Sequence, residues 1–451
     1  MDIEEFVKKN YKNKKNKNEI IEKLSSIIQY YKDIPLEQAE LLSKTVYDEV
    51  LITEKLNQEN LGDILKFPET NIGMGEFGVG SRGQGDFYVH SKIAEIIKNT
   101  QTESIVNPTA QDDGGVVKVD DTYYITTAID GIHSRLSNYP FLAGFHTARA
   151  TLRDVCVMGA NPVALISDIH LADDGDIGKL LDYTAGICAV SELTGVPLVS
   201  GSTLRVGGDM VLGDRLVGAV GAVGSSTRMP KARSEAKEND IIIMTEGSGG
   251  GTITTTSIYN NYPNVIQETL NVQFIKASQL LNNYENQEVI HAMTDITNGG
   301  ITGDANEINK TTGLGIHLYL ENIIKLINPN VYSMLNELDI DPLGVSIDSL
   351  MLIVSKESVN EIIILLKNNG VKADIIGHIT NSGKTYIEDT DGNIEQIIPK
   401  FREAAYTPIK KVIESIHKSN FEEDKKIIDK ATQEAIDKKD NLVNWIRNRY
   451  E

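Results

Sequence analysis

Aspartates next to glycines or other small residues recur along the middle of the chain. They are Asp112 and Asp113 before Gly114-Gly115, Asp130 before Gly131, Asp154 in TLRDVCVMGANPVAL and Asp295 in HAMTDITNGGITGD. Small neighbours admit close approach of a ligand, and carboxylates from separate loops suit Mg²⁺ held between protein and phosphates. Taken singly, each aspartate except Asp154 is more simply explained as a helix cap or a turn residue.

Asp154 stands apart because its neighbours predict a buried helix. Leu152, Val155 and Met158 form an apolar stripe, and Gly159 follows as a C-cap. A buried carboxylate must be paired or must bind a cation. Asp154 is therefore the strongest single candidate for a metal ligand.

Two glycine patterns imitate nucleotide-binding motifs. Gly73, Gly75 and Gly78 satisfy G-x-G-x-x-G, but no strand is expected before them, as a dinucleotide site would require. We interpret residues 73–85 either as a mobile arm whose backbone N–H groups close over phosphate or as a plain linker. Gly383-Lys384-Thr385 resembles the end of a P-loop, but its spacing to Gly377 is wrong and a hairpin turn explains it.

The histidines and cysteines give weaker signals. His133, His146 and His170 could serve as acid–base groups, but no partner stands at metal-ligand spacing. Cys156 and Cys188 lie in apolar helical patterns, where a small core residue is the simpler interpretation than a nucleophile.

Composition limits the classes of protein. The 451 residues include 44 Lys plus Arg and 64 Asp plus Glu, a formal charge of −20. An acidic surface without a basic patch excludes nucleic acid as a partner, and two cysteines exclude a disulfide framework. We find no apolar run of about 18 residues and no signal peptide, so we expect no membrane association and a cytoplasmic location.

The acidity lies in the middle of the chain. Residues 71–400 hold 22 basic and 40 acidic groups, whereas residues 1–70 hold 11 and 14 and residues 401–451 hold 11 and 10. A carboxylate-built cation site is therefore expected in the middle. Both ends carry apolar residues at helical spacing, which predicts helices that pack on the body and leaves a docking surface for a partner protein open.

The middle alternates glycine clusters, β-rich runs and helical stretches, which predicts an α/β or α+β fold. The β-rich runs cover 123–127, 216–223 and 241–244, and the apolar pattern lapses over SSTRMPKARSEAKEN at 225–239. We therefore divide the chain into a helical extension over 1–70, domains over 71–226 and 227–400, and a helical tail over 401–451. The run 216–223, treated as a strand edge that needs covering, predicts a homodimer.

Five ordered segments resemble the aminoimidazole ribonucleotide synthetase (AIR synthase) superfamily, whose members include thiamine-monophosphate kinase, selenophosphate synthetase and the hydrogenase maturation factor HypE. DDGGVV at 112–117 resembles the family's D-D-A-A-V, and RDVCVMGANP at 153–162 resembles its S-D-x-x-A-M-G-A-x-P helix. The other matches are TTAIDGIHSR, VSGSTLR and AMTDITNGG, at 126–135, 199–205 and 292–300. The match spans about residues 71–400. Ser202 and Asn298 replace acidic residues of several members.

The resemblance implies a PurM-like fold of two α/β domains, extended here by helices at both ends, and a dimer formed through the N-terminal sheet. It implies Mg-ATP-dependent phosphoryl transfer to an oxygen of a small-molecule substrate. The implied metal ligands are Asp112, Asp113, Asp130, Asp154 and Asp295. The implied ATP and phosphate contacts are Gly83, Gly85, Arg135, Arg149, Arg153, Thr203, Gly299 and Gly300, with Arg205 a weaker candidate. The alternative, prompted by Ser202, Asn298 and the helical ends, is a non-catalytic assembly or maturation factor that keeps the ATP-binding fold.

Overall fold

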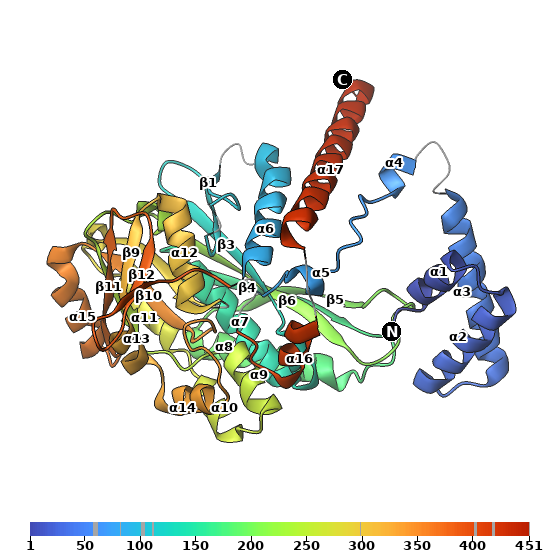
Figure 1. The fold of residues 1–451 in the computed structure, drawn as a ribbon, viewed down its shortest axis with the longest axis horizontal. Helices are drawn as coiled ribbons and strands as arrows, with labels where there is room; N and C mark the ends of the chain where they lie inside the picture. The colour runs from blue at the N-terminus through green and yellow to red at the C-terminus, as the bar shows by residue number, and fades with distance from the viewer. Residues whose placement is uncertain are drawn as a thin grey trace.

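The computed structural model describes residues 1–56, 62–81, 83–100, 104–110, 112–297, 299–400, 404–416 and 420–450. Its body contains two β-sheets, each with helices packed against it, and helical extensions stand at both ends (Figure 1). The predicted α/β fold, extended by helices at both ends, is confirmed. No helix in these ranges is long and apolar enough to cross a membrane.

The first sheet has six strands in the order β1-β2-β3-β6-β4-β5. The strands are β1 Ser104–Val106, β2 Gly115–Lys118, β3 Tyr124–Gly131, β4 Asn161–Leu171, β5 Leu198–Arg205 and β6 Leu216–Ser226. β6 lies between β3 and β4. The expectation that residues 216–223 form an exposed edge is therefore wrong, because β3 and β4 satisfy both sides of that strand.

One face of this sheet is covered by α7 Pro140–Val157 and α8 Gly178–Thr194. The two helices approach closely at glycines, since a Cβ on Gly144 would lie 2.0 Å from the Tyr183 carbonyl oxygen and one on Gly186 would lie 2.1 Å from that of Phe141. The opposite face is open. The strand register places Ile129 and Ile166 side by side there across Gly221, and their side chains are 71% and 42% exposed.

The second sheet has seven strands in the order β13-β12-β9-β11-β7-β10-β8. They are β7 Ile241–Thr245, β8 Ile290–Ile296, β9 Gly315–Tyr319, β10 Ser349–Val354, β11 Ala373–Thr380, β12 Thr385–Glu388 and β13 Ile394–Gln396. The associated helices are α9 Gly251–Tyr259, α10 Pro263–Thr269, α11 Gln273–Asn282, α12 Gly300–Thr312, α13 Leu320–Leu326, α14 Pro329–Glu337 and α15 Val359–Asn368. Helices and strands share two apolar cores in this half of the chain.

The segment that resembles a P-loop forms a turn, with Gly383 at φ 65°. The hairpin predicted there is nevertheless wrong. β11 and β12 both pair with β9, which lies between them. The turn takes the chain past the end of β9, so that β11 and β12 lie on either side of that strand. The sequence around Gly383 does not reveal this, because β9 comes from residues 315–319.

The N-terminal extension is a helical bundle of α1 Ile3–Lys12, α2 Lys17–Tyr31 and α3 Leu36–Leu56, followed by the short α4 Gly62–Leu65. It shares its own apolar cluster with Leu212 of the body. The backbone N–H of Ile3 donates to the Met210 carbonyl at 2.9 Å, and Lys32 pairs with Asp174 at 2.7 Å. The bundle therefore packs on the β5–β6 connection, as expected from its apolar stripes.

The glycine-rich arm contains α5 Met74–Phe77 and leads into α6 Gln84–Ile97, with no strand before it in the described residues. This agrees with rejection of a dinucleotide site. The tail forms α16 Pro408–Ile416 and α17 Phe421–Tyr450, and Figure 1 shows α17 rising beside α6. Arg82 and Asn298 lie outside the described residues.

Candidate functional site

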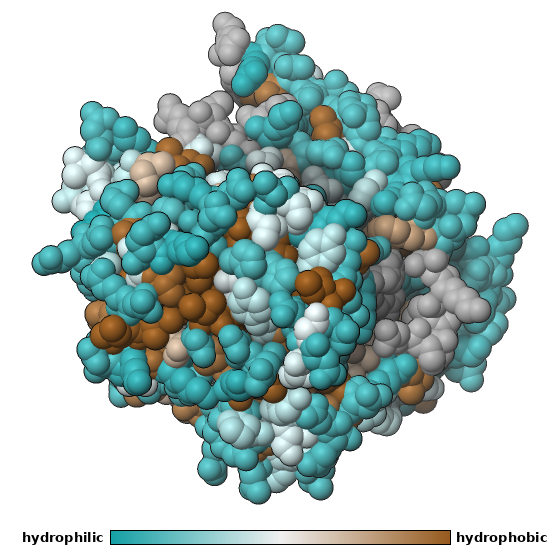
Figure 2. Space-filling model, turned by 60° about the vertical axis from the view of Figure 1, so that its left-hand side comes forward, coloured by the Kyte–Doolittle hydropathy of each residue, from teal (hydrophilic) through white to brown (hydrophobic). Residues whose placement is uncertain are grey.

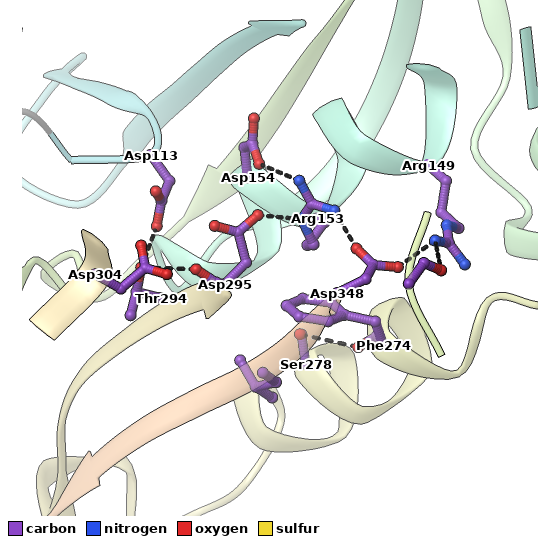
Figure 3. Close-up of polar contacts among 12 residues, drawn as sticks. Asp113, Arg149, Arg153, Asp154, Phe274, Ser278, Thr294, Asp295, Asp304 and Asp348 are labelled. Carbon is purple, nitrogen blue, oxygen red and sulfur yellow. Dashed lines mark hydrogen bonds and ion pairs between the residues drawn. The ribbon is translucent and has the colours of Figure 1, made fainter. Parts of the chain in front are cut away.

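Helix α7 carries three charged residues to the boundary between the two sheets. Arg153 pairs with Asp295 at the end of β8 and with Asp348 just before β10, and Asp154 lies 3.6 Å from the same guanidinium (Figure 3). Their exposed side-chain fractions are 8% for Arg153, 2% for Asp295 and 3% for Asp348. The residues predicted at 153, 154 and 295 are thus brought together from separate domains.

Arg149, one turn earlier on α7, is fully engaged by the second half of the chain. Its guanidinium donates to the carbonyls of Thr269, Asn271 and Gly249 at 2.9 Å each and pairs with Asp348. Burial alone would raise the pKa of Asp348, but Arg149 and Arg153 hold it below its ordinary value. The phosphate contact of Arg149 stays a prediction, and the contacts of its guanidinium join α7 to the second half of the chain.

The environment of the Asp154 carboxylate disfavours its ionised form. Burial raises its pKa well above the ordinary value, and the charges of Asp295, Asp130 and Asp113 raise it further, whereas Arg153 lowers it. Asp130 lies on β3 one residue after Ile129, so its side chain points to the sheet face that α7 covers. A cation bound here would relieve this repulsion.

Arg233 organises a second set of carboxylates next to the first. Its guanidinium lies 2.7 Å from Asp113, 3.2 Å from Glu307 and 3.6 Å from Asp304. Thr294 of β8 donates to Asp113 at 2.8 Å. The sequence analysis missed this set because Arg233 falls in the segment assigned to a domain boundary. The sequence signal that could have revealed this set was the pair Asp304 and Glu307, which stand three residues apart on the helix that follows Gly299-Gly300.

Asp112 adjoins this set. One of its oxygens accepts the backbone N–H of Arg233 at 3.0 Å, while Oδ2 is buried without a hydrogen-bond partner among the described residues. Burial raises the pKa of Asp112 to about 6, against the lowering influence of Arg233. An orphaned buried carboxylate oxygen is a natural cation ligand.

The charge balance supports a cation site, although the ligands are not gathered around one point. The two sets together comprise three arginines, Arg149, Arg153 and Arg233, and seven carboxylates, Asp112, Asp113, Asp154, Asp295, Asp304, Glu307 and Asp348. In the part of the chain that the structure describes, no three acidic, His or Cys side chains converge closely enough to hold a metal. The donor chemistry fits Mg²⁺, and binding would require these side chains to rearrange.

A cavity of about 550 Å³ opens beside the carboxylates, on the open face of the first sheet. Asp112, Asp113 and Glu307 line one side, and Ile129 and Ile166 form the apolar floor. Helix α6 supplies the opposite wall with the side chains Asp86, Phe87, His90 and Ile93. An acidic edge beside an apolar floor suits a ligand with a flat apolar part and a metal-bound anionic part.

The glycines predicted to meet phosphate have mixed positions. Gly83 is the N-cap of α6 and Gly85 is buried in its first turn, close to the cavity wall. Gly299 caps α12 with φ 87°, and a Cβ on Gly300 would lie 2.2 Å from the Leu343 carbonyl oxygen. The N–H of Gly300 already donates to Thr297 at 2.8 Å. The glycines at 299 and 300 are therefore explained by backbone packing, and phosphate binding there stays a prediction.

The other predicted phosphate contacts are Arg135, Thr203 and Arg205. Arg135 stacks on the Tyr259 ring, 3.7 Å from its centroid. Thr203 is exposed on the edge strand β5, three strands from Asp130 and so roughly 14 Å away. Arg205 pairs with Asp173 at 2.9 Å on the surface. Among the described residues, none of the three forms a hydrogen bond or ion pair with a carboxylate of the two sets, and their role as phosphate contacts stays a prediction.

Two histidines and both cysteines are among the weaker candidates from the sequence, and His146, His170 and Cys156 lie in the core or contact neighbouring side chains. His146 is buried against Thr254 at 2.8 Å, and His170 lies 3.0 Å from Asp168 on the open sheet face. Cys156 is buried in the core beneath the first sheet, where burial raises the pKa of its thiol. Cys188 is half-buried on α8. These positions agree with the interpretation of Cys156 as a core residue.

Comparisons with known proteins match both halves of the body. Residues 111–225 match the AIR synthase related protein, N-terminal domain, and residues 237–390 match the AIR synthase related protein, C-terminal domain. An uncharacterized protein of Methanocaldococcus jannaschii is 50% identical over 100% of this chain and 99% of its own length. Thiamine-monophosphate kinase of the same organism is 26% identical over 57% of this chain and 82% of its own length.

The fold is also found in a solved structure. The hydrogenase maturation protein HypE in complex with ATP superimposes with a TM-score of 0.53 at 18% identity, covering 63% of this chain and 87% of HypE. At this identity the likeness concerns the fold. The two matched domains, together with the full-length relative, show that the chain belongs to the AIR synthase-related family.

Proposed function

We propose that the protein binds Mg-ATP and transfers a phosphoryl group to an oxygen atom of a small-molecule substrate. The observation that carries this proposal is the surplus of buried carboxylates at the domain boundary, next to a cavity large enough for a small ligand. The proposal is supported by relatives whose names include a kinase and an ATP complex. A bound Mg²⁺ supplies positive charge to phosphate oxygens, which allows an acidic site to hold an anion.

The roles of the individual residues follow from their positions. Asp113, Asp154 and Asp295 are the proposed cation ligands, because the charges of Asp113 and Asp295 act on the Asp154 carboxylate where the two carboxylate sets adjoin. Asp130 adds negative charge behind Asp154, and Asp112 lies beside Asp113 with one oxygen available. Arg153 holds Asp295 in place for this task.

The open sheet face supports the proposal of a homodimer. Ile129, Ile166 and Leu204 project from this face and are 71%, 42% and 59% exposed. Such side chains rarely gather on one face of a monomer without a covering surface. A second copy of the chain placed here would cover the apolar floor of the cavity and shield it from water.

Isothermal titration calorimetry tests the binding part. Purified protein should release heat with ATP and Mg²⁺, and EDTA should abolish this heat. Asp154→Asn should weaken binding, whereas the matched variant Asp120→Asn should not, because Asp120 only accepts turn N–H groups at 2.7 and 2.9 Å on the surface. Equal effects of the two variants would remove the assignment of Asp154.

A second candidate is a non-catalytic assembly or maturation factor. It is favoured by apolar side chains exposed on the helical extensions, such as Leu41 at 66% and Trp445 at 56%, which offer surfaces to a protein partner. Figure 2 shows a face of the molecule that is mainly hydrophilic, with patches of hydrophobic residues between. Tight Mg-ATP binding without ADP or phosphate release, in the presence of a metabolite extract, would favour this second candidate over the enzyme.

A further inference from the structure

Helix α6 separates the cavity from the C-terminal helix. Asp86, Phe87, His90 and Ile93 face the cavity, whereas the side chain of Tyr88 faces α17. Among the described helices and strands, α6 contacts α17 more extensively than any other element, and Figure 1 shows the two helices side by side. The wall of the cavity is thus held from outside by the end of the chain.

One carboxylate of α17 makes the central contact. The Tyr88 hydroxyl donates to Asp429 at 2.5 Å, and the Lys92 ammonium lies 2.9 Å from the same carboxylate. Burial, together with Asp429, raises the pKa of Tyr88 to about 12, so the hydroxyl keeps its proton and remains a donor. Asp429 therefore joins two successive turns of α6 to α17.

The same contact includes the glycine-rich arm. The Phe421 ring at the start of α17 lies 5.4 Å from the Phe77 ring and 6.3 Å from the Tyr88 ring, measured between centroids. Phe77 is buried, although it belongs to the arm. The arm, α6 and α17 therefore share one aromatic cluster. α6 lacks a side-chain N-cap bond and has 14 residues, and a helix of that length is marginal without packing.

We propose that Asp429 is a positioning residue for the nucleotide site and that α17, through it, fixes α6 as the wall of the cavity. That the cavity binds a nucleotide rests on the function proposed above, whereas the positioning of α6 by Asp429 does not. The position of the C-terminal helix then sets the affinity of the site. Displacement of α17, by a partner or by substitution, loosens the wall and weakens binding.

The test uses the full-length chain with Asp429→Ala, the conservative Asp429→Asn and the control Asp437→Ala. Asp437 lies two turns further along α17 and accepts from Gln433 of the same helix at 2.8 Å. Amide hydrogen exchange of residues 84–97 is measured without nucleotide, with α7 as the internal reference. Calorimetry measures Mg-ATP binding.

Asp429→Ala should speed exchange in α6 but not in α7 and should weaken Mg-ATP binding roughly three- to tenfold, the range expected for one charged hydrogen bond and one exposed ion pair. Asp429→Asn, whose amide oxygen still accepts from Tyr88, should restore most of the protection, and Asp437→Ala should change neither readout.

Unchanged exchange in α6 with Asp429→Ala overturns the proposal, and so does faster exchange with unchanged affinity. If faster exchange with Asp429→Ala extends to α7, the decision passes to Tyr88→Phe, which removes the hydroxyl that donates to Asp429. Faster exchange in α6 alone in that variant supports the positioning role, and unchanged exchange in α6 overturns it. If the wild type binds no Mg-ATP, the proposed function fails, and exchange in α6 still decides the positioning role.

Discussion

His133 offers a quantitative test of the contacts that join the first domain to α9 and to the segment before α16. Its Nδ1 lies 2.9 Å from the Thr255 hydroxyl on α9, and its Nε2 lies 2.9 Å from the Tyr406 hydroxyl in the segment that precedes α16. Both contacts suit a neutral imidazole, which has one donor and one acceptor. Burial lowers the pKa of His133 to about 4, and the positive charges of Lys410 and Arg135 lower it in the same direction.

The magnitude follows from the difference between the two states. An exposed histidine in the unfolded chain has a pKa near 6.5, so a folded value of about 4 corresponds to about 3 kcal/mol of differential stability. Because the folded pKa is depressed, the unfolded chain takes up the proton first as pH falls. The contribution of His133 is therefore fully present above pH 6.5 and is lost progressively as pH falls from 6.5 to about 4.

The assay is urea unfolding of wild type and His133→Asn at pH 7.5 and pH 4.5. Asn lacks the titration, so the wild type should lose about 2 to 3 kcal/mol more than the variant between these pH values. The variant should be less stable at pH 7.5 by about 1 kcal/mol because one hydrogen bond is lost. His90→Gln, whose side chain is 54% exposed, serves as the control. An equal pH dependence in wild type and His133→Asn would refute the reasoning.

Three further predictions concern the proposed site. Asp154→Asn should weaken Mg-ATP binding by roughly ten- to a hundredfold, the effect of one lost charged contact, and Asp120→Asn should leave it unchanged in calorimetry. Ile129→Glu, which places a charge on the open sheet face, should shift the protein from a dimer to a mass near 50 kDa in sedimentation; wild type at that mass would contradict the dimer. The arm at residues 73–85 should gain amide protection on addition of Mg-ATP, and unchanged protection would argue against a closing arm.

Local elements followed well from the sequence because apolar periodicity is a local signal. The β-rich run 241–244 lies within β7, and the run 216–223 lies within β6. The buried helix inferred around Asp154 is α7, and Gly159 adopts φ 82° just beyond its end. The pattern did not contain the order of the strands, because paired residues of β9 and β12 are 69 residues apart in the chain. The edge assigned to β6 and the hairpin at Gly383 were wrong for this reason.

The candidate site shows the same division between local and distant information. The family resemblance located Asp113, Asp154 and Asp295, and the structure places them near one another, but their role as ligands stays a prediction. Arg233 was missed because nothing in its own segment indicates burial. Its partner Asp113 lies 120 residues earlier in the chain, and its partners Thr294 and Glu307 lie 61 and 74 residues later. Only the folded structure shows that an arginine in a polar stretch contacts these side chains.

The helical extensions mark the limit of what a family resemblance can transfer. The apolar stripe of α17 requires a covering surface, and the sequence alone does not say which surface that is. In the structure α6, more than 300 residues earlier, contacts α17 around Asp429 and its opposite side lines the cavity, whereas Leu442 and Trp445 of α17 stay 37% and 56% exposed. A segment outside the family's two matched domains therefore contacts the wall of the proposed site. For this reason the affinity of the site, and the way it responds to partners, must be measured on the full chain.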